Sequence, residues 1–446
     1  MSKRAKAMVG RVLEVPVSSL DDHGQGVGPA DGRTVAVHGA LPGDVVKARV
    51  TWASAASAWT RAELLEVLRP SGERVHNPCA HAPRCPGCPL MPLSPDAQLR
   101  EKGLRLRRAL DDAGLQDLHF DDVIPAPQNH GYRNRAKYVV ACTRNTVTLG
   151  AYAPGTHDVL PTDQCRVTAP AITEAIQALR SLIAPELVGE LRYVVARCNR
   201  AGEVLGTLVV RRRGAVDALA QAWVTTSPRV LGVVEHFNDS PGDNLLSTAP
   251  DAERTLQGHA ELTELFSGVP VSVPSTAFTQ LHADAAEQLC TTVAQLVQPL
   301  AGRHVMDAYC GLGAFAFALK DAASVLGIDD NPASIHAAND AAAHAGLGHL
   351  RFLVGDAAGH MAQWQHGQRP DLVVVDPPRK GLSDEAMRAL QALAPEQLVY
   401  VACEPRSLAR DLTTLRAAGW QVRALQPFDL FPQTPEVETV ALLSSR

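Results

Sequence analysis

The chain of 446 residues is predicted to end in an α/β domain with a largely parallel sheet, after a small β-barrel and a mixed, mainly β region. After residue 270, apolar runs such as HVMDAY, SVLGID and DLVVVD alternate with helical runs, a pattern typical of buried parallel strands. Near the N-terminus, short alternating strands are separated by glycine turns. The predicted domains are residues 1–68, 69–268 and 269–446.

The composition narrows the class of protein. With 46% hydrophobic residues and a net charge of −5, neither a mainly disordered chain nor a uniformly basic nucleic-acid binder is predicted. No run approaches the roughly 20 apolar residues that cross a bilayer, and the basic start is not followed by an apolar stretch. Nine cysteines without a secretion signal favour a reducing compartment. We expect a cytoplasmic monomer without a membrane partner.

The first 68 residues have the pattern of a small barrel. Valines alternate in VGRVLEVPV and in RTVAVHGALPGDVVKARVTW, and glycines punctuate both runs. The order of Gly24-Gln25-Gly26-Val27-Gly28 and Ala40-Leu41-Pro42-Gly43-Asp44 resembles a TRAM domain. That resemblance implies an OB-like, RNA-binding module of the kind found on RNA-modifying enzymes.

The central region combines an amphipathic helix, expected over residues 95–115, with strands such as AKYVVACT and LRYVVARC. A basic segment with a tyrosine precedes the first of these strands, and it matches backbone contact plus stacking on RNA. The alternative is an ordinary solvated charged face. The predicted RNA-binding residues are Tyr132, Arg133, Arg135 and Lys137.

Ligands of parallel α/β sheets bind outside the carboxyl ends of the strands, so residues that follow strands are site candidates. Glycines there let a ligand approach the backbone, and acids there can bind ribose hydroxyls or an adenine edge. A turn or helix-cap role is the alternative for each acid. Together these residues resemble the Rossmann-like class I S-adenosylmethionine-dependent methyltransferases. The candidates are Tyr309, Gly311, Gly313, Asp329, Asp356 and Asp376.

Cys403 ends a predicted strand just before a helix, with Arg406 nearby, and both neighbours favour a thiolate. An inert buried cysteine is the alternative. A thiolate suits one methyl transfer: its addition at C6 of a pyrimidine makes C5 nucleophilic, after which a base must remove the C5 proton. Glu438, at the start of the strand ETVALL, can supply that base, or it is simply a glutamate on an exposed face.

The segments DPPRKGL, YVACEPRSLARDL and FPQTPEVETVALL resemble the RNA uracil-C5 methyltransferase family, and the barrel places the chain nearest its TRAM-containing 23S rRNA members. The resemblance implies that Cys403 is the nucleophile and Glu438 the base. It also implies that Asp376 contacts both uracil and cofactor. Gln280 would contact S-adenosylmethionine, as would Tyr309, Asp329 and Asp356.

Three positions depart from the family pattern. Glu404 follows the nucleophile where Asn or Ser is usual, and we expect its side chain to point outward. Glu436 replaces the histidine of a Thr-x-His-x-Glu signature. Ala314 stands where related enzymes often place an Asn for the cofactor.

A cysteine-rich segment suggests a metal site. Cys79, Cys85 and Cys88 have the spacing C-x5-C-x2-C, and Cys165 lies far downstream. Spacing alone favours zinc, although it is near that of plant-type ferredoxins. The family resemblance instead implies a [4Fe–4S] cluster held by all four. Radical S-adenosylmethionine enzymes use C-x3-C-x2-C, so that class is rejected.

The predicted function is transfer of a methyl group from S-adenosylmethionine to C5 of a specific uridine through a covalent Cys–C6 adduct. The first choice of substrate is 23S rRNA, because the barrel resembles that of the rRNA members. A tRNA T-loop uridine is the second. A different class, a non-catalytic iron–sulfur RNA-binding protein, is disfavoured by the presence of Cys403, Glu438 and Asp376.

Overall fold

The structure is a computed structural model that describes residues 7–82, 84–240, 246, 251–364 and 367–445. The chain forms two compact units. The first is Met1–Arg108 with Phe431–Val437, and the second is Ala109–Leu430 with Glu438–Arg446. Residues 69–108, which we assigned to the central domain, therefore belong to the same unit as the barrel.

The first unit is built on a six-stranded sheet whose alternating valines point into one core. In β1 the burial alternates strictly along the strand, as the sequence pattern predicted. The strand order is β1 (Val12–Pro16), β5 (Val45–Ala53), β6 (Trp59–Arg69), β4 (Arg33–Val37), β3 (Gly26–Ala30) and β2 (Ser19–Leu20).

An apolar cluster explains why the segment after the barrel belongs to the first unit. Leu20 and Leu41 of the barrel pack with Leu90, Leu93 and Ala97. The last of these lies in α2 (Pro95–Asp112), the helix that we predicted over 95–115. Apolar burial thus joins the cysteine-rich segment and the helix to the barrel.

Helix α2 also binds the segment Phe431–Val437 of the same unit. The fully buried Lys102 donates from Nζ to the Phe431 carbonyl at 3.0 Å. Arg105 donates from Nη1 to the Pro435 carbonyl at 3.0 Å and pairs with Glu436 at 3.0 Å. Glu436, a departure from the family pattern, therefore has an arginine partner, and two basic residues of the helix serve the fold.

The central part of the second unit is a seven-stranded mixed sheet with α3 (Pro170–Leu182) and α4 (Asp217–Thr226) packed into its core. The mainly β prediction for this region is confirmed. The order is β13 (Glu253–Gly258), β12 (Val230–Phe237), β11 (Val204–Val210), β10 (Leu191–Cys198), β7 (Arg135–Thr143), β8 (Thr146–Tyr152) and β9 (Val159–Pro161). A hairpin of β14 (Glu261–Phe266) and β15 (Val269–Pro274) follows.

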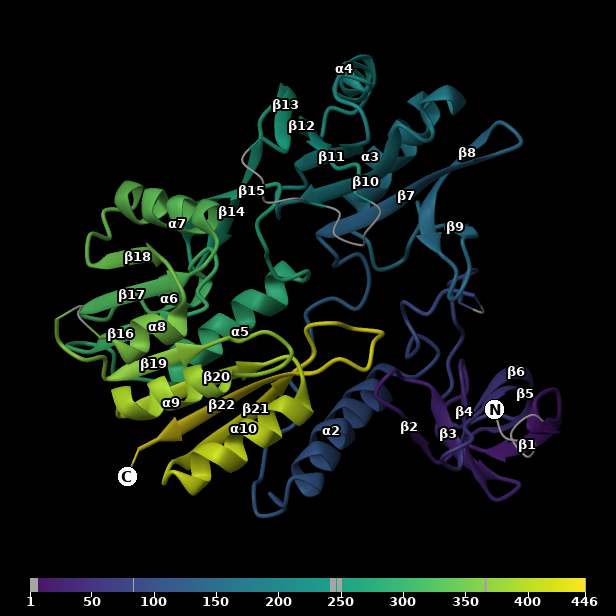
Figure 1. Ribbon diagram of the computed structural model, residues 1–446, viewed down its shortest axis with the longest axis horizontal. Helices are drawn as coiled ribbons and strands as arrows, with labels where there is room; N and C mark the ends of the chain where they lie inside the picture. The colour runs from purple at the N-terminus through teal and green to yellow at the C-terminus, as the bar shows by residue number, and fades with distance from the viewer. Residues whose placement is uncertain (1–6, 83, 241–245, 247–250, 365–366, 446) are drawn as a thin grey trace. The chain divides into compact units, whose positions relative to one another are not determined.

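The rest of the second unit is the predicted α/β domain, a seven-stranded sheet flanked by helices (Figure 1). The helices are α5 (Ala283–Leu296), α6 (Ala314–Ala318), α7 (Pro332–His344), α8 (Ala357–Ala362), α9 (Asp384–Leu393) and α10 (Pro405–Ala417). Five neighbouring strands are parallel, and β22 lies antiparallel between β20 and β21. The order is β18 (Leu350–Val354), β17 (Ser324–Asp329), β16 (His304–Ala308), β19 (Leu372–Val375), β20 (Gln397–Ala402), β22 (Glu438–Ser444) and β21 (Gln421–Phe428). The strand order reverses between β16 and β19, which makes their carboxyl ends the expected binding crevice.

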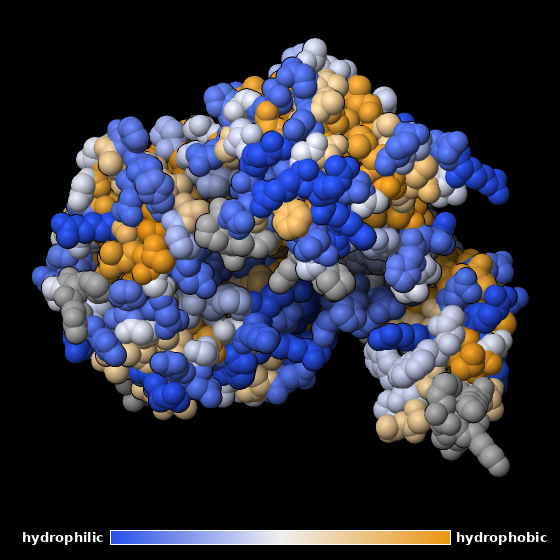
Figure 2. Space-filling view, turned by 45° about the horizontal axis from the view of Figure 1, so that its top comes forward, coloured by the Kyte–Doolittle hydropathy of each residue, from blue (hydrophilic) through white to orange (hydrophobic). Residues whose placement is uncertain are grey.

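One face of the molecule shows how polar and apolar side chains are distributed on the surface. The face in Figure 2 carries mainly hydrophilic side chains around smaller apolar groups. Among the described residues, no helix has both the length and the hydropathy needed to cross a membrane.

Candidate functional site

A pocket lies where the strand order reverses, in the second unit. Four residues selected from the sequence line it together: Gln280, Tyr309, Gly311 and Asp376. Its other walls come from the central sheet, the β15–α5 connection and the loop after β16. The additional lining residues that matter here are Asn134, Arg197, Arg200, Phe278, Thr279 and Ala314.

The loop after β16 is shaped to leave backbone open to the pocket. Tyr309 has a φ of 66°, a strained conformation for a residue with a side chain and one that is frequent at functional sites. Nothing lies within 4 Å of the Cβ position of Gly311, which borders the pocket. At Gly313 a Cβ would lie 2.7 Å from the ring of Phe352, so this glycine serves packing. Ala314 begins α6 (Ala314–Ala318) and lines the pocket.

Asp329 and Asp356 hold backbone at the strand ends. Asp329 accepts hydrogen bonds from the backbone N–H groups of Gly311 and Asn331, each at 2.9 Å. Asp356 is the N-cap of α8 (Ala357–Ala362) and accepts from the Gly359 N–H at 2.7 Å. Both carboxylates therefore hold turns of the backbone, and Asp329 fixes the glycine that borders the pocket. Binding of the cofactor by Asp329 and Asp356 stays a prediction.

Two acidic groups at the strand ends are strongly affected by burial. Burial raises the pKa of Asp376 to about 7. Burial raises the pKa of Asp307 to about 8, and the charges of Asp376 and Asp329 add to this increase. Asp307 was not selected as a site residue, although an acid within the apolar run HVMDAY is itself a signal. Such acids favour a positively charged ligand in the pocket.

Cys403 and Glu438 lie next to the last pair of the β20–β22 ladder. Val401 pairs with Val440 and Ala402 with Thr439, and Cys403 directly follows Ala402 while Glu438 directly precedes Thr439. The charge of Glu438 acts on the Cys403 thiol, so the two side chains are close to each other. Glu438 is 1% exposed and Cys403 is half-buried. The two residues selected for chemistry are therefore neighbours.

The expectation of a stabilised thiolate at Cys403 is wrong. Burial raises the pKa of Cys403 to about 12, and the carboxylates of Glu438 and Asp376 add to the rise. The opposing cation is Arg379, which follows Asp376-Pro377-Pro378, rather than Arg406. Two acids beside the sulfur outweigh the helix N-terminus.

Helix α10 (Pro405–Ala417) holds the loop that carries Arg379. Ser407 donates from Oγ to the Arg379 carbonyl at 2.9 Å. The buried Asp411 accepts from the Leu382 N–H at 2.9 Å and from the Tyr400 hydroxyl at 2.6 Å. Strand β20, helix α10 and this loop thus form one hydrogen-bonded support around Cys403.

Glu404, expected to point outward, is half-buried at the start of α10. Its carboxylate accepts from the Arg406 N–H at 3.4 Å and forms the N-cap of the helix. The departure from the family pattern therefore has a structural role, since an acid is favoured at this end of a helix.

The predicted RNA-binding segment is partly committed to the fold. Tyr132 is 6% exposed and stacks on His282, with ring centroids 4.9 Å apart. Arg133 and Arg135 are half-buried, and burial lowers the pKa of Arg135. Lys137 is exposed, 5.7 Å from the ring centre of Tyr193. Of the four, Lys137 has the exposure that an RNA contact needs.

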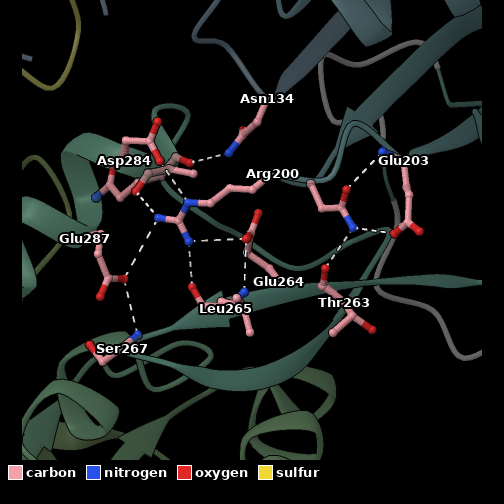
Figure 3. A network of polar contacts seen from close by, with 12 residues as sticks. Asn134, Arg200, Glu203, Thr263, Glu264, Leu265, Ser267, Asp284 and Glu287 are labelled. Carbon is pink, nitrogen blue, oxygen red and sulfur yellow. Dashed lines mark hydrogen bonds and ion pairs between the residues drawn. The ribbon is translucent and has the colours of Figure 1, made fainter. Parts of the chain in front are cut away.

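A network around Arg200 joins the central sheet to the α/β domain (Figure 3). Arg200 donates to the Asp284 carboxylate at 2.9 Å and to the Leu265 carbonyl at 2.8 Å, and it also contacts Glu264 at 3.4 Å. A further bond, 2.8 Å long, reaches the Ala283 carbonyl at the start of α5 (Ala283–Leu296). The network fixes this helix start close to the pocket. Sequence reasoning missed it.

The structure does not support a metal centre. Cys79, Cys85 and Cys88 belong to the first unit and Cys165 to the second, and all four are half-buried. Within the residues described, no three His, Cys, Asp or Glu side chains are grouped to hold a metal ion. The described residues therefore show neither the predicted [4Fe–4S] cluster nor a zinc site.

The strand order, the glycine-containing loop after the first strand and the pocket at the switch point define a class I S-adenosylmethionine-dependent methyltransferase. Residues 271–446 match the family model described as tRNA (Uracil-5-)-methyltransferase, and residues 6–64 match that of the TRAM domain. The chain belongs to the TRAM-containing RNA uracil-C5 methyltransferases, so the predicted family is confirmed.

Relatives along the whole chain agree with this assignment. An RNA methyltransferase of Thermosynechococcus vestitus is 33% identical over 98% of both chains. Another, of Geobacter sulfurreducens, is 35% identical over 97% of this chain and 90% of its own. The crystal structure of the Pyrococcus abyssi tRNA (uracil-54, C5)-methyltransferase, in complex with S-adenosyl-L-homocysteine, has a TM-score of 0.77. It is 26% identical, and the match covers 96% of this chain and 100% of that one.

Proposed function

We propose that this RNA methyltransferase methylates C5 of a specific uridine in 23S rRNA through a covalent adduct on Cys403. The observation that carries the proposal is that a thiol and a buried carboxylate flank the last pair of the β20–β22 ladder, where the charge of the carboxylate acts on the thiol. C5 methylation of a pyrimidine requires such a pair, whereas transfer to an amino group or a hydroxyl requires no nucleophilic thiol.

In the proposed reaction, the Cys403 thiol gives its proton to Asp376 as the sulfur adds to C6 of the uracil and electron density moves to C5. C5 takes the methyl group that bound S-adenosylmethionine would supply, with S-adenosyl-L-homocysteine as the leaving group. The C5 proton then passes to Glu438, the C6–sulfur bond breaks, and the Cys403 sulfur recovers its proton from Asp376. Asp376, whose pKa near 7 lets it donate or accept, is also proposed to hydrogen-bond the uracil edge. Burial, together with the carboxylates of Glu438 and Asp376, keeps the Cys403 thiol in its protonated form until it reacts.

The pocket residues fit S-adenosylmethionine. Gly311 offers open backbone, the buried Asp376 favours a cation, and Gln280 and Tyr309 complete the wall. When bound, the cofactor supplies an electrophilic methyl group and a positive charge. Asp329 accepts from the Gly311 N–H and so fixes this part of the wall. Asp329 and Asp356 are also proposed to bind the cofactor itself.

The target base must leave its stack to reach Cys403. Phe278 presents an aromatic side chain that is 68% exposed and lines the pocket, so we propose it as the stacking surface. Lys137, Arg133 and Arg135 are proposed to contact the RNA backbone. Tyr132 would need to part from His282 to stack on a base.

A tRNA uridine is the second candidate, favoured by the Pyrococcus abyssi structure. Because the match covers 96% of this chain, it cannot omit residues 6–64, so the barrel alone does not separate rRNA from tRNA substrates. Mapping 5-methyluridine in rRNA and tRNA, from cells with and without this gene, distinguishes the two substrates. Loss of one 23S rRNA site supports the first choice, loss in tRNA supports the second, and loss at neither refutes uridine methylation.

A [4Fe–4S] cluster on Cys79, Cys85, Cys88 and Cys165 now rests on the family resemblance alone. Anaerobic purification with iron and sulfide analysis tests it. About four iron and four sulfide per chain would support the cluster, and their absence, or stoichiometric zinc, would reject it.

A further inference from the structure

The connection between β15 and α5 forms one wall of the pocket without regular structure. Residues Ala277, Phe278, Thr279 and Gln280 belong to no helix or strand. The last three line the pocket. A segment without a backbone ladder keeps its shape only if other groups bind it. Other groups must therefore hold Phe278 and Gln280 in the positions from which they would contact the base and the cofactor.

Arg197, on strand β10 of the central sheet, grips this segment at two points. Its Nη2 donates to the Ala277 carbonyl, and its Nη1 donates to Thr279 Oγ1 at 3.0 Å. These two acceptors flank Phe278. One guanidinium therefore fixes the backbone before the exposed ring and the side chain after it.

Asn134 hydrogen-bonds the end of the same segment. Its side-chain Nδ2 donates to the Gln280 carbonyl at 3.0 Å, and its backbone N–H donates to the Leu281 carbonyl at 3.0 Å. Figure 3 shows Asn134 directed at this connection, beside the Arg200 network that fixes the start of α5. The central sheet thus holds both the segment and the helix that follows it.

The position of Arg197 is costly for the fold. The residue is 5% exposed and lies directly opposite Arg135 in the β10–β7 register. Burial, followed by the charge of Arg135, lowers the pKa of Arg197 to about 9. Among the described residues, its Nε finds no hydrogen-bond partner. A buried arginine opposite another arginine is unfavourable unless its contacts serve a purpose.

We propose that Arg197, assisted by Asn134, is a positioning residue that sets the geometry of the cofactor and base pocket through the Ala277–Gln280 segment. Neither side chain takes part in the chemistry. Their function is to keep Phe278 and Gln280 in the binding geometry before ligands arrive, which lowers the ordering cost of binding. The inference rests on the proposed function only for the identity of the base.

The test is binding of S-adenosyl-L-homocysteine to the full-length protein without RNA, measured by isothermal titration calorimetry. Arg197→Met removes both donors, and we expect Kd to rise at least about tenfold, because each bond made by a charged donor is substantial. Arg197→Lys, which can keep one donor, should recover part of the loss. The matched control is Arg192→Met on the same strand, where the arginine bonds the Asn238 carbonyl at 2.7 Å instead.

A local readout separates positioning from general stability. Hydrogen–deuterium exchange should increase in the peptide spanning 276–281 in Arg197→Met but not in Arg192→Met. If Arg197→Met fails to fold, Thr279→Val removes one acceptor from the opposite side and should raise both Kd and local exchange, whereas Thr279→Ser should not.

Unchanged Kd and unchanged exchange in the folded Arg197 or Thr279 variants would overturn the proposal. The control Arg192→Met having an equal effect would also overturn it. Because the assay contains no RNA, a wild-type protein that binds S-adenosyl-L-homocysteine but methylates no uridine refutes the proposed function and leaves this inference standing.

Discussion

The Cys403–Glu438 pair and the neighbouring pocket wall are built by different interactions. Cys403 and Glu438 flank the last pair of the β20–β22 backbone ladder. The Ala277–Gln280 segment of the pocket wall has no ladder and depends on the side chains of Arg197 and Asn134. Substituting a side chain leaves the backbone hydrogen bonds of a ladder largely intact. The same change removes every hydrogen bond that the side chain itself makes.

This difference predicts a division of effects. Substitutions at Cys403 or Glu438 should change the chemistry and leave cofactor binding nearly unchanged. Substitutions at Arg197 should change binding first. The following experiments test whether the effects on catalysis and the effects on cofactor binding separate in this way.

The largest effect is expected from Cys403→Ala. Removing the nucleophile should lower methyl transfer by about 10⁴-fold or more, because the remaining site cannot activate C5. The affinity for S-adenosyl-L-homocysteine should stay within about twofold, since no backbone contact changes. Tritium transfer to RNA and calorimetry measure the two quantities. Cys142→Ala, in strand β7, is the control, and residual turnover near that of the wild type would break the comparison.

Glu438→Gln should lower turnover by about 10²–10⁴-fold, the usual range for loss of a general base. Because the block comes after methylation, the methylated RNA should remain attached to Cys403 and migrate with the protein on denaturing gels. Glu404→Gln, which changes an acid next to Cys403 that caps α10, is the matched control and should turn over normally. A Glu438→Gln enzyme that releases product at the normal rate would assign the base elsewhere.

The reactivity of Cys403 towards iodoacetamide should follow the charges around it. Glu438 raises the pKa of Cys403 and Arg379 lowers it. Because the thiolate is the reactive form, a lower pKa increases the reactive fraction, so Glu438→Gln should speed alkylation at pH 8. Arg379→Gln should slow it. Mass spectrometry of the Cys403 peptide across pH measures both. Equal rates in all three proteins would contradict the electrostatic account.

The smallest effect on turnover is expected from Asp411→Asn, which should lower activity only a few-fold. This buried carboxylate accepts hydrogen bonds from Leu382 and Tyr400, so its loss should reduce the free energy of unfolding by about 1–3 kcal/mol. Urea titration followed by circular dichroism measures the loss. The exposed Glu385→Gln on α9 (Asp384–Leu393) should stay within about 0.5 kcal/mol.

Much of the strand-end side could be predicted from the sequence. Continuous apolar runs predicted the positions of β16, β19 and β20. Among the residues that follow these strands, Tyr309, Gly311 and Asp376 line the pocket. The prediction worked because a parallel sheet brings all its carboxyl ends to one edge. The family motifs then selected Cys403 and Glu438.

The contacts of the opposite side could not be predicted, because they join residues far apart in the sequence. Arg197 lies 82 residues before Thr279, and Asn134 lies 146 before Gln280. Local patterns also failed where burial decides: a helix N-terminus predicted an ionised Cys403, but desolvation and two acids outweigh it. The ring of Tyr132 looked available for a base, yet His282 covers it.

The central claim is that Cys403 attacks C6 of the target uridine. Wild-type protein should be mixed with S-adenosylmethionine and substrate RNA carrying 5-fluorouridine at the mapped site, then digested and analysed by mass spectrometry. Because fluorine cannot leave as a proton does, the account predicts a denaturant-stable adduct on the peptide that contains Cys403, absent from Cys403→Ala. Full methyl-donor binding with no adduct, or an adduct on another cysteine, would contradict it.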